Sequence, residues 1–294
     1  MSIDKEYGIV LKGIGGFYYV LKDNEVHECK AGGRLRLGEL SPVAGDMVTF
    51  EVTGEDGLIT SIKERKNSLT RPPVANIDRL FIVASMASPK SDPFLIDKIT
   101  VMALRQDIEP IILLNKNDID HSDKLFDIYS DIGFKTIRVS AVTNEGIDSV
   151  KSLVSQGISC FTGNSGIGKS SILNQLLPEK NLLVGKISEK ISRGKNTTRQ
   201  SELLPCCGGF VIDTPGFSSF DITKAESIPK EELQYYFPEI SIYFDKCRFS
   251  GCAHIKEPGC AVRQQVKEKV ISLSRYESYV KLYNELSLIK EWEK

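Results

Sequence analysis

The chain of 294 residues lacks several features that mark membrane, fibrous or secreted proteins. No apolar run approaches the roughly 20 residues that a membrane-spanning helix needs, and residues 1–6 contain no apolar signal-peptide segment. There is no internal repeat, which excludes a solenoid, and no low-complexity tract. We therefore expect a cytoplasmic protein that does not bind membranes.

The chain also lacks an excess of charge of either sign. It has 38 Lys and Arg residues against 39 Asp and Glu residues, a formal net charge of −1. A uniformly basic surface is excluded, so any nucleic-acid-binding surface must be local. The composition, 41% hydrophobic and 26% charged, is ordinary for a soluble globular protein. The length predicts about two or three domains.

Cysteine is scarce and unevenly placed, with seven residues in the chain. Four of them lie in apolar surroundings, where we expect them to pack as small hydrophobic side chains. These are Cys29, Cys160, Cys206 and Cys207. The other three cysteines cluster with His254. In a cytosolic chain, such a cluster predicts a metal site before it predicts disulfides.

The cluster Cys247-x₄-Cys252-x-His254-x₅-Cys260 offers three thiolates and one imidazole. This set completes the tetrahedral coordination of a structural Zn²⁺ and leaves no position for a reactive water. The spacing is not that of a C-x₂-C finger, and four unligated side chains in a small loop are the alternative. We favour zinc because little else near these residues predicts a core.

Residues 1–70 contain short β-forming runs separated by turn signals. Strands are predicted at 7–10, 16–20, 47–52 and 58–62. Four or five short strands in this length predict a small β-barrel, with the OB-fold as the leading candidate. Whether such a barrel binds RNA or only serves for docking stays open, because acidic residues slightly outnumber basic ones here. Residues 67–73 are predicted to be a linker whose prolines break regular pairing.

From residue 79 onward, buried-strand and helical patterns alternate. Apolar runs predict strands at 79–84, 110–114 and 158–161, and further strands are predicted at 135–139, 201–206 and 209–213. Helices are predicted at 94–103, 147–154 and 171–177. This alternation predicts a doubly wound α/β domain over residues 71–226. Residues 227–294 are predicted to form a largely helical domain around the metal cluster.

Residues 163–170 match the phosphate-binding pattern G-x-x-x-x-G-K-S. With a strand before and a helix after, backbone N–H groups and the helix N-terminus can surround phosphate oxygens, which disfavours a chance Gly-rich turn. Lys169 is predicted to reach the outer phosphates, and the Ser170 hydroxyl to bind Mg²⁺. The full predicted phosphate set is Gly163, Asn164, Ser165, Gly166, Ile167, Gly168, Lys169, Ser170 and Ser171.

The four residues from Asn115 to Asp118 spell N-K-N-D directly after a predicted buried strand. In an N-K-x-D loop the Asp accepts from guanine N1–H and the 2-amino group, and the Asn faces N7 and O6. Adenine lacks both donors, and an unpaired buried polar group costs about 1–3 kcal/mol, so GTP is favoured over ATP. Lys116 completes the motif. Ser140 and Ala141 match the short loop whose backbone N–H meets guanine O6.

The residues from Asp213 to Gly216 match D-x-x-G. In this motif the Asp supports Mg²⁺ through water, and the Gly N–H contacts the γ-phosphate. The basic segment 181–199 before it is predicted to be a mobile switch. Within that switch, Thr198 is our choice for a hydroxyl that binds Mg²⁺, and Thr197 is the alternative.

The order of these motifs is reversed. They normally run phosphate loop, switch threonine, D-x-x-G, N-K-x-D and S-A, but here N-K-x-D and S-A come first. The order predicts a circularly permuted domain, since the same strands can form the same sheet with different chain ends. D-x-x-G then leads directly into the C-terminal domain, so the γ-phosphate is expected to move that domain.

The chain resembles the ribosome small subunit-dependent GTPase A family, circularly permuted GTPases that act in late small-subunit assembly. The resemblance runs nearly end to end, through the motifs above, R-G-x-x-T-T at 193–198 and D-T-P-G-F at 213–217. It implies an N-terminal OB-fold, a central P-loop GTPase and a C-terminal zinc domain. It also implies GTP with Mg²⁺, one structural Zn²⁺, and binding to the small (30S) ribosomal subunit and its rRNA. We expect a monomer.

One position departs from the family pattern. The family has a His immediately before the paired switch threonines, where this chain has Asn196. The residue after D-x-x-G, where many GTPases place a water-orienting Gln, is Phe217. Asn196 can orient a water but cannot act as a base. We therefore expect slow intrinsic hydrolysis, with the ribosome needed to order the switch.

Together the motifs predict a GTPase that binds the small subunit with GTP and leaves after hydrolysis. The loop amides, Lys169 and Mg²⁺ would stabilise the transition state, with Thr198 closing the site. The alternative is an rRNA-binding assembly scaffold in which GTP is only a conformational ligand and little turnover is required. A generic ATPase is the weaker rival.

Overall fold

The structure is a computed structural model that describes residues 6–33, 35, 40–53, 56–70, 73–177, 201–213 and 228–288. Its contacts divide the chain into two units. The first comprises Met1–Leu80, Ile147–Phe161 and Ser170–Phe217, and the second Phe81–Gly146, Thr162–Lys169 and Ser218–Lys294. In the described part of the chain, no helix has both the length and the apolar character needed to cross a bilayer.

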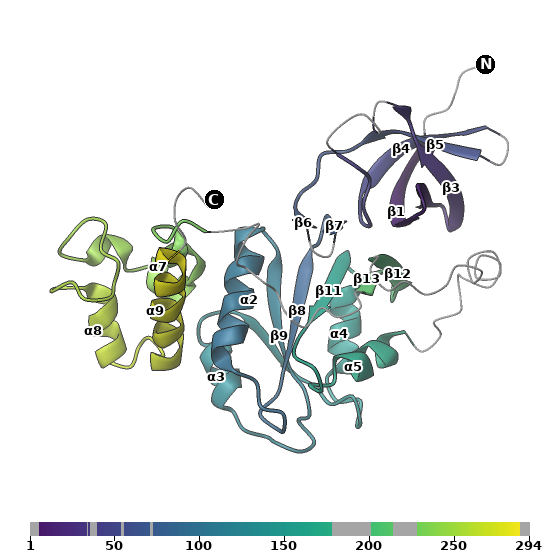
Figure 1. Cartoon of the computed structure of the whole chain (residues 1–294). Coiled ribbons are helices and arrows are strands. Elements are labelled where there is room, and N and C mark those ends of the chain that lie inside the picture. Colours follow the sequence, from purple (N-terminus) through teal and green to yellow (C-terminus); the bar gives the residue numbers. More distant parts are fainter. Residues whose placement is uncertain are drawn as a thin grey trace. The chain divides into compact units, whose positions relative to one another are not determined.

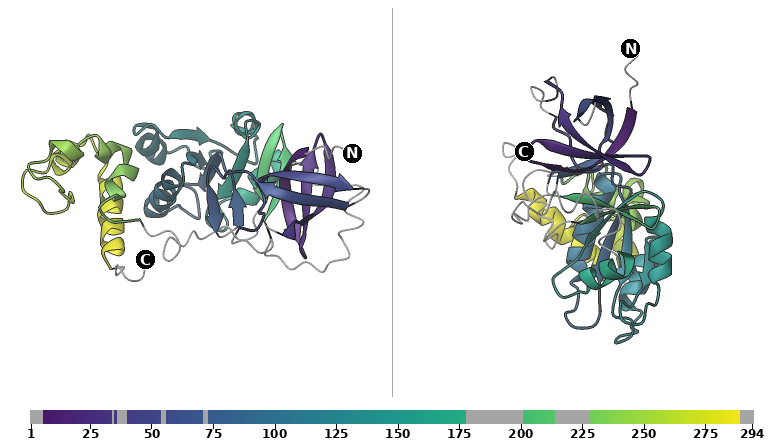
Figure 2. Two further views of the ribbon diagram at one scale, coloured as in Figure 1. Left: turned by 90° about the horizontal axis from the view of Figure 1, so that it is seen from above. Right: turned by 90° about the vertical axis from the view of Figure 1, so that its right-hand side faces the viewer.

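A closed barrel opens the first unit (Figure 2). Its strands are β1 (Glu6–Ile14), β2 (Phe17–Lys22), β3 (Glu25–Ala31), β4 (Met47–Thr53) and β5 (Asp56–Ile62), in the order β1-β2-β3-β5-β4. Side chains that alternate along the strands fill the interior, among them Val10, Val20, Phe50 and Ile59. The predicted small β-barrel of four or five strands is confirmed and has five, although β3 was not among the four strands predicted by residue range.

The segment after the barrel is paired, so the prediction of an unpaired linker over residues 67–73 is wrong. Strands β6 (Ser68–Thr70) and β7 (Pro73–Ala75) form an antiparallel ladder. The buried Asn67 amide closes it by donating to the Ile77 carbonyl and accepting from the Ile77 N–H, both at 2.8 Å. Pro73 is tolerated because it is the first residue of its strand.

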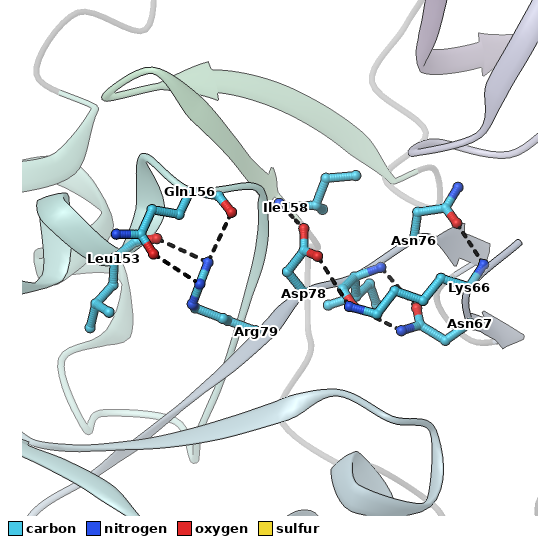
Figure 3. A network of polar contacts seen from close by, with 9 residues as sticks. Lys66, Asn67, Asn76, Asp78, Arg79, Leu153, Gln156 and Ile158 are labelled. Atoms are coloured by element: carbon cyan, nitrogen blue, oxygen red, sulfur yellow. Dashed lines mark hydrogen bonds and ion pairs between the residues drawn. The ribbon is translucent and has the colours of Figure 1, made fainter.

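A polar network continues from this hairpin to the next strands (Figure 3). The Asp78 carboxylate accepts from the Ile158 N–H at 2.8 Å and from Lys66 Nζ at 3.2 Å. The Arg79 guanidinium donates to the carbonyls of Leu153, at 3.2 Å, and Gln156, at 3.1 Å. These bonds fix the chain after the barrel to the end of helix α4 (Ile147–Val154) and the start of strand β11 (Ile158–Thr162).

The central sheet has six strands in the order β10-β9-β8-β11-β13-β12. Besides β11 these are β8 (Arg79–Ala84), β9 (Glu109–Leu114), β10 (Lys135–Arg138), β12 (Glu202–Cys206) and β13 (Gly209–Asp213). The β9–β10 and β11–β13 pairs are parallel, and β12 is antiparallel to β13. Helices α2 (Pro93–Arg105), α3 (Lys124–Ser130), α4 and α5 (Lys169–Leu176) connect the strands. The predicted α/β class is confirmed.

The C-terminal region is helical. It contains η1 (Leu233–Tyr236), α7 (Pro238–Ser241), η2 (Phe244–Lys246), α8 (Ala261–Lys267) and α9 (Leu273–Ser287), and α9 packs against α2 (Figure 1). Buried side chains including Phe237, Ile240, Tyr279 and Leu282 pack with Val101 of α2. The expectation that little core exists near the metal cluster is therefore wrong, because aromatic residues spaced along short helices supply one.

A buried cation joins this region to α2. Arg275 of α9 is fully buried; it donates from Nη1 to Asp97 Oδ1 at 2.6 Å and from Nε to Glu239 Oε1 at 2.7 Å. The Tyr129 hydroxyl donates to the same Asp97 oxygen at 2.8 Å, and the guanidinium lies 4.5 Å from the centre of the Phe237 ring. Four elements, α2, α3, α7 and α9, thus share one buried polar cluster.

We predict that Arg275→Met lowers the free energy of unfolding by about 3–5 kcal/mol, because two buried carboxylates lose their only compensating cation in the cluster. The matched control is Lys98→Met, which removes a partly exposed ion pair with Glu285 between the same two helices. That pair is expected to contribute about 0–1 kcal/mol. Urea unfolding measures both, and equal losses in the two variants would contradict the role of Arg275.

Candidate functional site

The predicted phosphate loop connects β11 to α5, the strand–loop–helix context that such a loop requires. Three of its glycines have positive φ: Gly163 at +151°, Gly166 at +77° and Gly168 at +96°. At Gly168 a side chain is also excluded by space, since a Cβ would lie 2.1 Å from the Asn115 amide nitrogen. Lys169 is half-buried, while Ser170 and Ser171 are exposed at the start of α5.

The buried Asn115 side chain links three segments at the carboxyl end of β9. Its Nδ2 donates to the Ile167 carbonyl of the phosphate loop at 2.9 Å. Its Oδ1 accepts from the Ala141 N–H at 3.4 Å, and its own N–H donates to the Ala84 carbonyl at 2.7 Å. The N-K-N-D loop, the S-A loop and the phosphate loop are thereby brought together in one unit.

Lys116 reinforces this arrangement. Its Nζ donates to the Gly166 carbonyl at 3.0 Å and to the Ser88 carbonyl at 2.6 Å. Its backbone lies in the left-handed region, with φ +66°, which turns the chain sharply after the strand. The lysine therefore lies against the phosphate loop, and it also holds the segment that precedes α2.

The exposed Asp118 carboxylate is oriented by Ser140. The buried Ser140 hydroxyl accepts from the N–H groups of Val142 and Thr143, at 3.2 and 3.1 Å. Its single proton is then donated to Asp118 Oδ1 at 2.6 Å. The carboxylate is thus held by one oxygen before any ligand is bound, an arrangement suited to accepting from the N–H groups of a base.

Two residues that the sequence reasoning missed brace the same loops. The Asn117 side chain donates to Glu145 Oε1 at 2.8 Å, and the Asn117 N–H donates to the Val139 carbonyl at 3.2 Å. Asn117 occupies the variable position of N-K-x-D, so the motif itself gave no signal for it. In the sequence, the carboxylate of Glu145, five residues after Ser140, was the one sign of this contact.

The structure describes only part of the segments that are predicted to sense the triphosphate. Asn196, Thr197, Thr198 and Gly216 lie outside the described residues. Asp213 is the last residue of β13, where its backbone pairs with Glu202, and its side chain is not described. Roles in Mg²⁺ binding and hydrolysis therefore stay predictions.

The four donors of the predicted metal cluster converge. Side-chain atoms of Cys247, Cys252, His254 and Cys260 all lie within 4.8 Å of one another. His254 Nδ1 is 3.5 Å from the sulfurs of Cys247 and Cys260. Burial raises the pKa of Cys252 to about 12 and lowers the pKa of His254. The neutral imidazole is the form that binds metal, and cysteine binds metal as a thiolate, so a cation that binds here would release the thiol protons. Three convergent sulfurs and one imidazole nitrogen are a donor set that fits a metal ion.

Gln234 holds the histidine from the other side. Its Oε1 lies 3.0 Å from His254 Nε2. Because Nδ1 faces the sulfurs, the ring proton belongs on Nε2, where Gln234 accepts it. The His254 backbone has φ +62°, and its carbonyl accepts from the Tyr276 hydroxyl at 2.8 Å. Sequence spacing alone could not reveal this partner, which comes from η1.

Comparison with known proteins places these sites in a family context. A family model described as RsgA GTPase matches residues 62–223, and one described as RsgA N-terminal domain matches residues 7–59. A relative from Caldanaerobacter subterraneus subsp. tengcongensis, named small ribosomal subunit biogenesis GTPase RsgA, is 41% identical over 99% of this chain and 98% of its own length. A protein of the same name from Geobacillus thermodenitrificans is 41% identical over 95% of this chain and 97% of its own.

Solved structures agree with these matches. The crystal structure of YjeQ from Thermotoga maritima superposes with a TM-score of 0.82 at 34% identity, covering 98% of this chain and 100% of that one. The structure of YloQ, described as a circularly permuted GTPase, gives 0.79 at 34% identity, covering 97% and 96%. Both likenesses span the whole fold and not the nucleotide-binding part alone.

We predict that Gln234→Leu weakens divalent-metal binding about 10–100-fold, because His254 loses the partner that sets its ring orientation. The measurement is competition between the Co²⁺-loaded chain and a chelator. Gln264→Leu on α8, whose amide contacts only Glu268 among the described hydrogen bonds, serves as the matched control and should bind Co²⁺ normally. Equal affinities for the two variants would show that Gln234 does not position the ligand.

Proposed function

The chain belongs to the RsgA GTPase family, and from this premise we propose that it binds the small ribosomal subunit and acts in its late assembly. The observation that carries the proposal is the Asn115 contact set, which brings the three permuted nucleotide motifs together. Support for the partner comes from the relatives, whose shared name refers to small-subunit biogenesis and whose lengths match this chain nearly end to end.

We propose that GTP occupies the loops described above. Asp118 would accept from guanine N1–H and the 2-amino group, while Lys116 and Ala141 would border the base. The amides of residues 163–168 and Lys169 would hold the phosphates, as the strand–loop–helix geometry supports. Because both base loops are braced by protein contacts, little ordering is needed when guanine binds.

For hydrolysis we propose electrostatic stabilisation by the loop amides and Lys169. Ser170, Thr198 and Asp213 would hold the Mg²⁺ that accompanies GTP and neutralises developing phosphate charge, and Gly216 would contact the γ-phosphate. Asn196 would orient the attacking water without accepting its proton. Intrinsic turnover would then be slow, with binding to the small subunit ordering the residues that complete the site.

For the metal centre we propose one structural Zn²⁺ held by Cys247, Cys252, His254 and Cys260. The support is the Cys₃His donor set and its burial, since such sets bind zinc in closed tetrahedral sites. The zinc domain would extend over residues 227–294, after a GTPase domain at 71–226 and an OB-fold at 1–70. We propose that the barrel and the zinc domain both contact rRNA.

The experiment that tests the function is GTP turnover measured with and without purified small subunits. We predict at least about tenfold stimulation by the subunits, because subunit binding would order the residues that complete the site. A tenfold increase corresponds to an activation free energy lower by about 1.4 kcal/mol. Lys169→Ala should abolish the stimulated turnover. Equally fast turnover in both conditions would overturn the proposal. A Lys169→Ala variant that still binds GTP and completes assembly would favour the scaffold function instead.

Base selection is tested at Asp118. We predict that Asp118→Asn weakens GTP binding by about 10- to 100-fold, an amount equivalent to about 1–3 kcal/mol, and improves binding of xanthosine triphosphate. Asp120→Asn is the control, because its carboxylate accepts from the Ser122 N–H within its own turn. Fluorescent-nucleotide competition measures both variants. Unchanged GTP affinity in Asp118→Asn would contradict the assignment of the base.

A further inference from the structure

The turn between β12 and β13 carries two adjacent cysteines. Cys206 is the last residue of β12 and pairs with Gly209, so that Cys207 and Gly208 form the two-residue turn. Both have positive φ, +53° and +92°. Turns of this kind favour Asn, Asp or Gly at each central position, because other side chains crowd the left-handed backbone. Cys207 therefore occupies a strained position.

The surroundings hold this turn in place. The Gly209 backbone lies against the end of α4, since a Cβ there would be 2.1 Å from the Val154 carbonyl. The next N–H, of Phe210, donates to the Gly157 carbonyl at 2.9 Å. This is the α4 end that Arg79 caps through Leu153 and Gln156 (Figure 3). A residue that breaks a local rule within a firmly held structure points to a role beyond folding.

The two thiols lie close together in different environments. Their sulfurs are 3.5 Å apart, and Cys206 is buried while Cys207 is exposed. The expectation that both pack as hydrophobic side chains is thus wrong for Cys207, which the turn directs to solvent. Cys206 Sγ also donates to the Leu176 carbonyl at 3.4 Å, at the end of the helix that follows the phosphate loop.

Electrostatics separates their reactivity. Burial, together with the neighbouring thiol, raises the pKa of Cys206 to about 12, and Lys151 acts against this shift. Cys206 is thus a protonated thiol at neutral pH and a poor first nucleophile. The exposed Cys207 is the sulfur that a dissolved oxidant reaches.

We propose that Cys206 and Cys207 form a vicinal dithiol site that a hydroperoxide oxidises to a disulfide. Cys207 thiolate attacks the peroxide oxygen, the O–O bond breaks, and a sulfenic acid forms with release of water or an alcohol. Cys206 sulfur then attacks the sulfenic sulfur, the S–O bond breaks, and water leaves with the Cys206 proton. The two thiols lose two electrons and two protons, and one peroxide is reduced.

The bond is readily reversed by thiols. Adjacent Cα atoms are about 3.8 Å apart, below the range of about 4.4–6.8 Å usual for disulfides, so the ring is strained and easily reduced. Oxidation also removes the S–H donor from the Leu176 carbonyl. The redox state of the turn is thereby connected to α5, the helix that begins at Lys169.

The test treats the zinc-loaded full chain with hydrogen peroxide, followed by alkylation under denaturing conditions and mass spectrometry. In the peptide that contains residues 206–207, both thiols should become resistant to alkylation and the mass should fall by two hydrogens. Dithiothreitol should restore both thiols. This oxidation should precede any release of zinc, which a chromogenic chelator detects. Cys207→Ser should lose this response, and Cys29→Ser, a buried barrel thiol, should retain it. The proposal is overturned if Cys207 is oxidised to a sulfinic acid while Cys206 remains open to alkylation. It is also overturned if zinc is released before the disulfide forms.

A second variant tests the strain. Cys207→Asn places a residue that tolerates the left-handed backbone at the turn, so the midpoint of thermal unfolding should rise while the disulfide is lost. A midpoint that is unchanged or lower shows that Cys207 is not strained and removes the structural basis of the proposal. Cys206→Ala should abolish the disulfide as well, leaving Cys207 as the only oxidised residue of the pair.

Discussion

The side-chain amide of Asn115 connects the loops that are predicted to bind the nucleotide. Asn115 is anchored to the neighbouring strand by its own N–H, and its side chain reaches the phosphate loop in one direction and the S-A loop in the other. Gly168 is required beside it because any Cβ would collide with that amide. The permuted order of the motifs is tolerated because this contact depends on where strands end in the sheet and not on where the chain begins.

A second constraint connects the same loops to the helical region that carries the Cys₃His cluster. Lys116 donates a hydrogen bond to the Ser88 carbonyl, which lies just before α2. Asp97 of α2 in turn accepts a hydrogen bond from Arg275 of α9. The permutation suggested that the γ-phosphate acts on the C-terminal domain through the chain that follows D-x-x-G. The described contacts add another connection through α2, fixed by a fully buried cation that is unfavourable to separate from its carboxylates.

The sequence predicted what is local. The phosphate loop, N-K-N-D, S-A and the Cys₃His cluster are short patterns whose chemistry depends on spacing, and the buried strands β8, β9 and β11 contain continuous apolar runs. It missed β3, whose Glu25, His27, Glu28 and Lys30 look like a loop but pair with β2. It also missed the β6–β7 pairing, because the nearby prolines indicated a linker, although Pro73 is tolerated as the first residue of its strand. It missed Gln234, Glu145 and Arg275 because each depends on a partner at least 20 residues away in the chain, and propensity carries no information about such partners.

The central proposal is that the nucleotide bound at these loops governs attachment of the chain to the small ribosomal subunit. The most direct measurement is the affinity of the full, zinc-loaded chain for purified small subunits, compared between GDP and a non-hydrolysable GTP analogue at one salt concentration. The account predicts binding at least about tenfold tighter with the analogue, a difference of about 1.4 kcal/mol. Equal affinity with both nucleotides would contradict it.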